Sequence, residues 1–149
     1  MTHCDMRFVT GLAGLLVALA LSGGTGVAAA DREVYENTGF TSPSGNIGCY
    51  IDTDYIRCDI RERNWEPPPT DCEFGPGQGI QISPYVNPDG PAEFECAGDS
   101  AQNNDPPLPY GESITAGPMR CDSAESGITC RNTVNGHGFF ISRQAYQLF

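Results

Sequence analysis

Six cysteines constrain the fold of this chain more than any other feature of its sequence. They follow residues 1–30, which are predicted to be a secretory signal peptide: Arg7 precedes the apolar run Phe8–Leu21, and Ala28–Ala30 offers a small-residue cleavage site. Removal of this peptide takes Cys4 away and leaves an even number of cysteines. An even set in an exported domain predicts a disulfide framework formed in an oxidising compartment. These cysteines are Cys49, Cys58, Cys72, Cys96, Cys121 and Cys130.

The length of the apolar run favours cleavage over membrane anchoring. Phe8–Leu21 is shorter than the roughly 20 residues that a spanning helix needs. A lipoprotein would carry a cysteine at the end of this run, whereas Cys4 precedes it. We therefore expect a cleaved product that is secreted into the cell envelope or medium, with a flexible lead-in over 31–39 and one disulfide-stapled domain over 40–149.

The apolar residues that follow the predicted signal peptide favour strands. Only Leu108 and Leu148 remain of the leucines, whereas all nine isoleucines lie after residue 30. β-branched and aromatic residues are enriched in strands, and the many prolines and glycines favour short elements joined by turns. We predict a small all-β fold, either an antiparallel meander or a compact sandwich, with at most one or two helical turns over 142–149. The expected strands lie within 49–60, 79–83, 92–96, 113–121, 128–131 and 137–142.

The cysteine spacing predicts which residues pair. Cys49 and Cys58 are nine residues apart, as are Cys121 and Cys130. A two-residue turn at 53–54 would place Cys49 opposite Cys58 at a non-hydrogen-bonded site, where side chains come closest. A turn at 125–126 does the same for the second pair. We therefore predict two hairpin staples and, by elimination, a Cys72–Cys96 bridge.

Seven segments resemble a family of small secreted actinobacterial proteins, mostly mycobacterial, that is known as a domain of unknown function. They occur in the family's order and cover nearly all of 40–149. The resemblance implies export and a disulfide scaffold, and it brings no activity and no catalytic residues. The segments are TSPSGNIGC (41–49), RCDI (57–60), WEPPP (65–69), FECAGDS (94–100), LPYGES (108–113), GITCRN (127–132) and GHGFFISRQAYQLF (136–149).

The charge of the chain excludes several classes of partner. The net charge is −11 and the chain contains no lysine. Nucleic acids and anionic membrane surfaces prefer the opposite sign, so we expect no nucleic-acid binding, and no membrane contact after signal cleavage. Lysine-based covalent chemistry is also excluded. The arginines Arg57, Arg61 and Arg63 have two interpretations: they pair with nearby acids such as Asp59 and Glu62, or they receive an anionic ligand.

Three residues are candidates for a binding site. His137 titrates near neutral pH and is flanked by glycines that would let a ligand approach, although it could equally be a strand-entry histidine with local hydrogen bonds. Trp65 and Tyr110 could contribute to an aromatic binding surface. We expect Trp65 to be mostly core and Tyr110, within a turn, to be the better exposed of the two.

No complete catalytic set is recognisable. The chain lacks a Gly-x-Ser-x-Gly elbow, and the six cysteines are expected to form bridges. A single histidine after residue 30 makes a zinc site improbable, and the acidic loop around Asp99–Asp105 lacks the spacing of an EF-hand. We expect no metal, no cofactor and no catalytic residues.

The leading functional hypothesis is a non-enzymatic binding module of the cell envelope or extracellular medium, with an unknown protein or a cell-wall ligand as its partner. One alternative is a small secreted hydrolase that uses His137. Another is an extracellular enzyme inhibitor that presents 105–111 as an exposed loop.

Overall fold

The computed structural model describes residues 30–149 except 70, 74, 76, 85–88 and 97. The predicted signal peptide lies outside the described residues, apart from Ala30. The described residues form strands and no helix, and accordingly none of them lies in a helix long and apolar enough to cross a membrane. The predicted all-β class is therefore confirmed.

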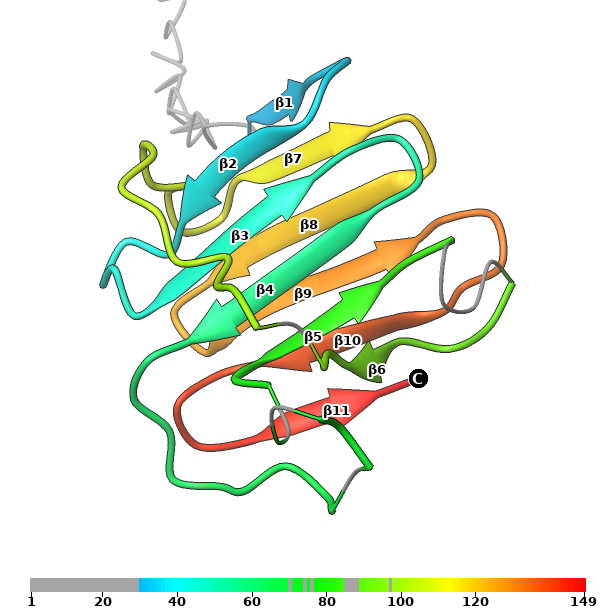
Figure 1. The fold of residues 1–149 in the computed structure, drawn as a ribbon. Helices are drawn as coiled ribbons and strands as arrows, with labels where there is room; N and C mark the ends of the chain where they lie inside the picture. The colour runs from blue at the N-terminus through cyan, green and yellow to red at the C-terminus, as the bar shows by residue number, and fades with distance from the viewer. Residues whose placement is uncertain (1–29, 70, 74, 76, 85–88, 97) are drawn as a thin grey trace, which may run out of the picture.

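Eleven strands in the described residues form two sheets (Figure 1). In the first sheet, β1 pairs with β7 in parallel, and the remaining pairs are antiparallel. The second sheet is antiparallel throughout. The first sheet has the order β1 (Asp31–Glu33), β7 (Ser113–Ala116), β8 (Met119–Ala124), β9 (Gly127–Asn132), β10 (Gly138–Ile141) and β11 (Tyr146–Leu148). The second has the order β2 (Thr38–Thr41), β3 (Ile47–Ile51), β4 (Ile56–Ile60), β5 (Gly79–Ile82) and β6 (Glu93–Phe94).

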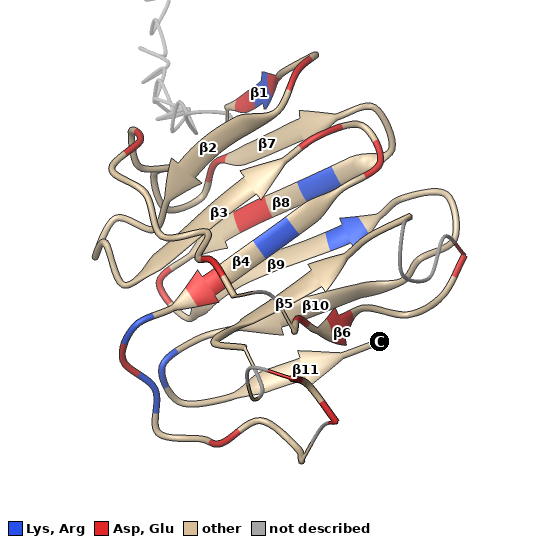
Figure 2. Cartoon of the chain, viewed as in Figure 1, with Lys and Arg blue, Asp and Glu red and all other residues tan. Residues whose placement is uncertain are grey.

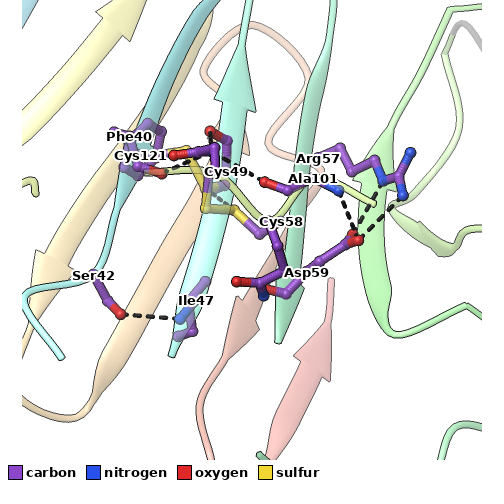
Figure 3. The surroundings of a disulfide bond; sticks show 12 residues. Phe40, Ser42, Ile47, Cys49, Arg57, Cys58, Asp59, Ala101 and Cys121 are labelled. Atoms are coloured by element: carbon purple, nitrogen blue, oxygen red, sulfur yellow. Dashed lines mark hydrogen bonds and ion pairs between the residues drawn. A yellow bond between two sulfur atoms is a disulfide. The ribbon is translucent and has the colours of Figure 1, made fainter. Parts of the chain in front are cut away.

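The two sheets pack face to face as a sandwich, with their strands nearly aligned (Figure 1). Buried isoleucines and cysteines recur at every second residue along β3, β4 and β9, as the two-residue period of strands requires, and turn one face of each sheet inward. Two hairpin disulfides meet at the centre of this core, because Cys58 Sγ lies 3.8 Å from Cys130 Sγ. Figure 3 shows the first of them between β3 and β4. The disulfides therefore occupy part of the volume that leucines fill in other cores.

All three predicted disulfides are present: Cys49–Cys58, Cys72–Cys96 and Cys121–Cys130. The predicted register of the first hairpin is also confirmed, since Cys49 lies opposite Cys58 and the residues beside the turn, Asp52 and Tyr55, exchange backbone hydrogen bonds. The second hairpin repeats the arrangement around 125–126. Hence nine-residue cysteine spacing identified two stapled hairpins correctly.

Two expected elements differ from the structure. The single strand expected over 113–121 is wrong, because Gly117, at φ 54°, and Pro118 turn the chain between β7 and β8. The helical turns expected over 142–149 are also wrong, since this segment turns back and pairs with β10 as β11. In addition, the lead-in 31–39 contains β1 and the beginning of β2, where flexibility is expected from sequence.

A connection over 98–108, here called the strap, crosses the outer face of the second sheet (Figure 1). Asn103 Nδ2 donates to the carbonyl oxygen of Cys49 at 3.1 Å, and Leu108 N–H donates to that of Thr41 at 2.9 Å. Gly48 permits the close approach, because a Cβ there would lie 2.8 Å from the carbonyl oxygen of Ala101. The strap is therefore fixed along its length, although its sequence is typical of a loop.

Candidate functional site

A cleft of about 460 Å³ opens at one end of the sandwich, on the left in Figure 1. Connections from both sheets form its walls: the β2–β3 and β10–β11 turns, the β8–β9 turn, and the segment that leads into β7. Residues far apart in the sequence therefore meet at this end. The side chains that matter below are those of Ser42, Asn46, Arg61, Glu62, Tyr110 and Arg143.

Hydroxyl groups at the base of the cleft hold its turns in place. Ser42 is buried, and its Oγ accepts a hydrogen bond from Ile47 N–H at 3.1 Å (Figure 3) and lies 3.1 Å from Ser44 Oγ. Ser142 Oγ accepts from Ala145 N–H at 3.1 Å and lies 3.0 Å from its carbonyl oxygen. Such side chain to backbone bonds stabilise tight turns. These serines therefore shape the walls and are not arranged as free nucleophiles.

Asn46 ties two walls of the cleft together. Its Nδ2 donates to the carbonyl oxygen of Glu62 at 2.9 Å, while its Oδ1 accepts from Glu62 N–H at 2.8 Å. Arg61 N–H donates in turn to the carbonyl oxygen of Asn46 at 3.0 Å. The β2–β3 turn consequently fixes the backbone from which Arg61 extends.

Tyr110 projects from a segment that is anchored on both sides. Leu108 is buried before it, and Gly111 N–H donates to the carbonyl oxygen of Ser123 at 2.8 Å after it. The Tyr110 side chain itself is 47% exposed. The loop expected over 105–111 is thus only partly exposed, and it presents one aromatic ring beside the cleft.

Charged side chains occupy the mouth of the cleft. Arg143 Nη1 lies 3.4 Å from Glu62 Oε2, and both side chains are more than half exposed. Arg61 Nε donates to Gln102 Oε1 at 2.9 Å. A second cleft of about 470 Å³ adjoins the first through their shared residues Arg61, Glu62 and Arg143. The mouth is therefore polar, with arginines on both sides.

A buried ion cluster on the outer face of the second sheet supports Arg61 indirectly. Arg57, 6% exposed, binds Asp59 through Nε and Nη2 at 3.0 and 3.1 Å. Nη2 also donates to Glu95 Oε1 at 2.9 Å, and Nη1 donates to Asp99 Oδ1 at 2.7 Å. Asp59 Oδ2 also accepts from Ala101 N–H at 2.8 Å (Figure 3). This cluster holds the strap on the sheet, and the next strap residue, Gln102, positions Arg61.

The ion cluster perturbs the titration of its members. Burial by itself would lower the pKa of Arg57, but the hydrogen bonds to Asp59 and Asp99 outweigh it and hold that pKa above its ordinary value. The hydrogen bond from Arg57, with its charge, lowers the pKa of the Asp99 carboxyl. Arg57 and Asp99 therefore remain ionised across the neutral range.

Comparison with known proteins identifies the family. The profile of a family of unknown function, DUF6636, matches residues 13–149. The chain belongs to this family. No curated protein matches this DUF6636 chain, and neither does any solved structure. The segments quoted for the family resemblance contribute Ser42, Tyr110 and Arg143 to the cleft of this DUF6636 protein, although they are distant in the sequence.

The three binding candidates from the sequence do not lie together in the DUF6636 chain. Tyr110 lines the cleft, whereas His137 lies in the β9–β10 turn at the other end of β9. Five residue steps along β9 correspond to roughly 16 Å. Within the described part of the chain, no hydrogen bond or ion pair joins the His137 imidazole to a serine or carboxylate side chain. His137 and the cleft serines therefore do not form a nucleophile–base pair.

Trp65 packs on the edge of the core, in line with the interpretation that it is mostly core. Its ring lies 4.7 Å from Tyr146 and 6.0 Å from Phe94, between centroids, and its Nε1 donates to the carbonyl oxygen of Ser142 at 2.8 Å. Trp65 therefore supports the β10–β11 turn and does not line the first cleft. Arg143 is not among the site residues predicted from the sequence, where its place in the last family segment is the only indication of a role.

The structure clarifies the acidic candidates as well. Asp99 pairs with Arg57, and Asn103 Oδ1 accepts from Asp105 N–H at 3.0 Å. Among the residues that the structure describes, no three histidine, cysteine, aspartate or glutamate side chains cluster as metal ligands do. Asp99 and Asn103 are thus engaged in holding the strap.

Proposed function

We propose that this DUF6636 protein is a secreted, non-enzymatic binding module of the cell envelope or extracellular medium, and that the cleft at the end of the sandwich is its ligand site. The observation that carries this proposal is the convergence of connections from both sheets on an open cleft of about 460 Å³. Small-molecule sites commonly have volumes of about 300–1,000 Å³. Its size therefore suits one or two sugar or amino-acid units.

The state of the cleft side chains supports binding over catalysis. The hydroxyls of Ser42 and Ser142 are engaged in turn hydrogen bonds, and His137 lies at the far end of the sandwich. Catalysis by a serine needs a general base within hydrogen-bond distance. A rigid wall with an exposed ring and charged groups at its mouth is what recognition requires.

The disulfides support a site of action outside the cytoplasm. Three bridges join all six cysteines of the described domain, and such frameworks persist in oxidising compartments. Together with the predicted signal peptide, they support a ligand in the envelope or medium. A polar cell-wall fragment is a ligand that such a protein would encounter there.

The proposal is tested by co-sedimentation with purified actinobacterial cell walls. The whole coding sequence is expressed with export, so that the disulfides form, and wild type is compared with Tyr110→Ala and Tyr35→Ala. Tyr35 is the matched control, because it is 79% exposed and lies between β1 and β2, away from the cleft. We expect wild type and Tyr35→Ala to sediment with the walls and Tyr110→Ala to lose at least tenfold in affinity. Equal binding by all three proteins, or by none, would overturn the proposal.

A further inference from the structure

Three arginines gather at the cleft of a protein that is otherwise acidic. Arg61, Arg63 and Arg143 line the second cleft, so that three of the seven arginines of the described residues lie around one mouth. Figure 2 shows them in the connection after β4 and in the β10–β11 turn, at the same end of the sandwich. The net charge of the whole chain is −11. Glu62, Glu66 and Glu125 belong to the same lining and balance the charge of these arginines, so an anion would bind there by displacing carboxylates.

Arg61 is the arginine best placed to receive this anion. Its Nε is held by Gln102 at 2.9 Å, and Gln102 is fixed by its own Nε2, which donates to the carbonyl oxygen of Asp59 at 2.7 Å. Among the described residues, no carboxylate forms an ion pair with Arg61. Its two terminal nitrogen atoms are therefore presented on an anchored side chain, and a fork of this kind matches a carboxylate.

The acids beside Arg143 and Arg63 can be displaced by a ligand. Arg143 and Glu62 are 3.4 Å apart and their side chains are 56% and 70% exposed, while Arg63 and the 90% exposed Glu66 are 3.7 Å apart. Exposed pairs of this geometry contribute little free energy. The buried pairs of Arg57 contrast with them, since those carboxylates are enclosed and held by further donors. An anion at the mouth would therefore replace Glu62 more easily than it would replace Asp59 or Glu95.

We propose that Arg61 and Arg143 form an anion subsite at the mouth of the cleft, which takes the carboxylate of an acidic saccharide. Both arginines line both clefts, so a carboxylate between them leaves the rest of the ligand inside the first cleft. There the Tyr110 ring offers a face for a sugar ring, and the Gln144 side chain offers hydrogen bonds to hydroxyls. The inference rests on the proposed function and specifies the ligand of that same cleft.

The test compares two sugars that differ by one acidic group. N-acetylmuramic acid carries a lactyl carboxylate that N-acetylglucosamine lacks, and both are titrated into the exported, oxidised protein while its amide resonances are followed. D-lactate alone supplies the carboxylate without the sugar. We expect N-acetylmuramic acid to bind about tenfold more tightly than either, a ratio that corresponds to about 1.4 kcal/mol. The preference should weaken with salt, because the arginines are exposed.

Variants connect the preference to the two arginines. Arg61→Gln and Arg143→Gln should each abolish the preference for the acidic sugar, whereas Arg131→Gln, on the outer face of the first sheet and 41% exposed, should keep it. The anion subsite would be refuted if N-acetylmuramic acid bound no more tightly than N-acetylglucosamine, or no more tightly than D-lactate. If Tyr110→Ala still prevents wall binding in that case, the proposed function stands while the anion subsite fails. If the acidic sugar is not preferred and Tyr110→Ala binds walls as wild type does, both proposals are refuted.

Discussion

Replacement of Arg57 by methionine is predicted to destabilise the domain strongly. Methionine keeps most of the packing of the aliphatic stem but removes the charge and all five hydrogen bonds of the guanidinium. Asp59 and Glu95 would then be left in the interior, with side chains that are only 3% and 2% exposed. Removing one partner of a buried ion pair costs about 3–5 kcal/mol, because the remaining charge is uncompensated.

This cost is large compared with the total stability of a small domain, which is about 5–15 kcal/mol. The assay is urea unfolding followed by tryptophan fluorescence, since Trp65 is the single tryptophan and packs at the edge of the core. Arg131→Met is the matched control. Its ion pair with Asp122 is 3.5 Å long and exposed, so its loss should cost less than about 1 kcal/mol.

The pH dependence distinguishes a charge effect from simple loss of packing. In Arg57→Met, Asp59 and Glu95 would keep their remaining contacts, such as Ala101 N–H on Asp59, but they would lose the compensating charge, and a buried acid costs less free energy once a proton neutralises it. The stability of the variant should therefore rise as the pH falls from 7 towards 5, whereas wild type should not gain. A loss below 1 kcal/mol, or a loss that does not change with pH, would refute the reasoning.

Two further predictions concern stability. The double variant Cys121→Ala/Cys130→Ala should lose about 3 kcal/mol of unfolding free energy, because the bridge no longer closes a loop of about ten residues in the unfolded chain. The lost contact with Cys58 Sγ adds to this loss. Thermal unfolding measures the change, and a loss below 1 kcal/mol would contradict the prediction. Wild type should lose stability as the pH falls below about 4, because hydrogen bonds from Arg57 to Asp99, and from Thr115 and others to Asp31, lower the pKa values of these carboxyls. The stability that each of these two carboxylates contributes is fully present above the pKa that it has in the unfolded chain. It is lost as the pH falls through the lower pKa that the carboxylate has in the folded protein. Urea unfolding from pH 7 to pH 2.5 should therefore show a smaller acid loss in Asp99→Asn, and an unchanged loss would contradict this assignment.

The hairpins could be predicted from the sequence because the constraint is local. The two-residue turn at 53–54 fixes which residues face each other, so the pairing of Cys49 with Cys58 follows from counting. The same applies to Cys121 and Cys130. The third bridge followed by elimination and needed no geometry.

The remaining fold depends on long-range pairings that local patterns do not encode. The C-terminal segment becomes β11 because β10 offers an edge, and β1 pairs with β7, which follows about eighty residues later. The strap has the composition of a free loop, but Arg57 and Asp59 on β4, together with backbone carbonyls of β2 and β3, hold it against the sheet. No sequence pattern at 98–108 predicts that this segment binds the sheet.

The candidate site was only partly predictable for the same reason. The turn around Tyr110 indicates an exposed ring, and Arg61 is one of three arginines that the sequence allows either to pair with nearby acids or to receive an anionic ligand. Arg143 could not be placed beside Arg61 without knowing that β4 and β10 end on the same side of the sandwich. His137 is a binding candidate from the sequence as the single histidine after residue 30, but the strand direction of β9 places it away from the cleft.

The most direct test of the cleft as a ligand site is amide chemical-shift mapping with soluble cell-wall fragments. The exported protein is labelled with 15N, and fragments released from actinobacterial walls are added stepwise. The account predicts that the perturbed amides lie in 42–46, 61–62, 108–112, 124–127 and 142–145. Perturbations that gather around the β9–β10 turn, or no perturbation at saturating fragment concentration, would contradict it.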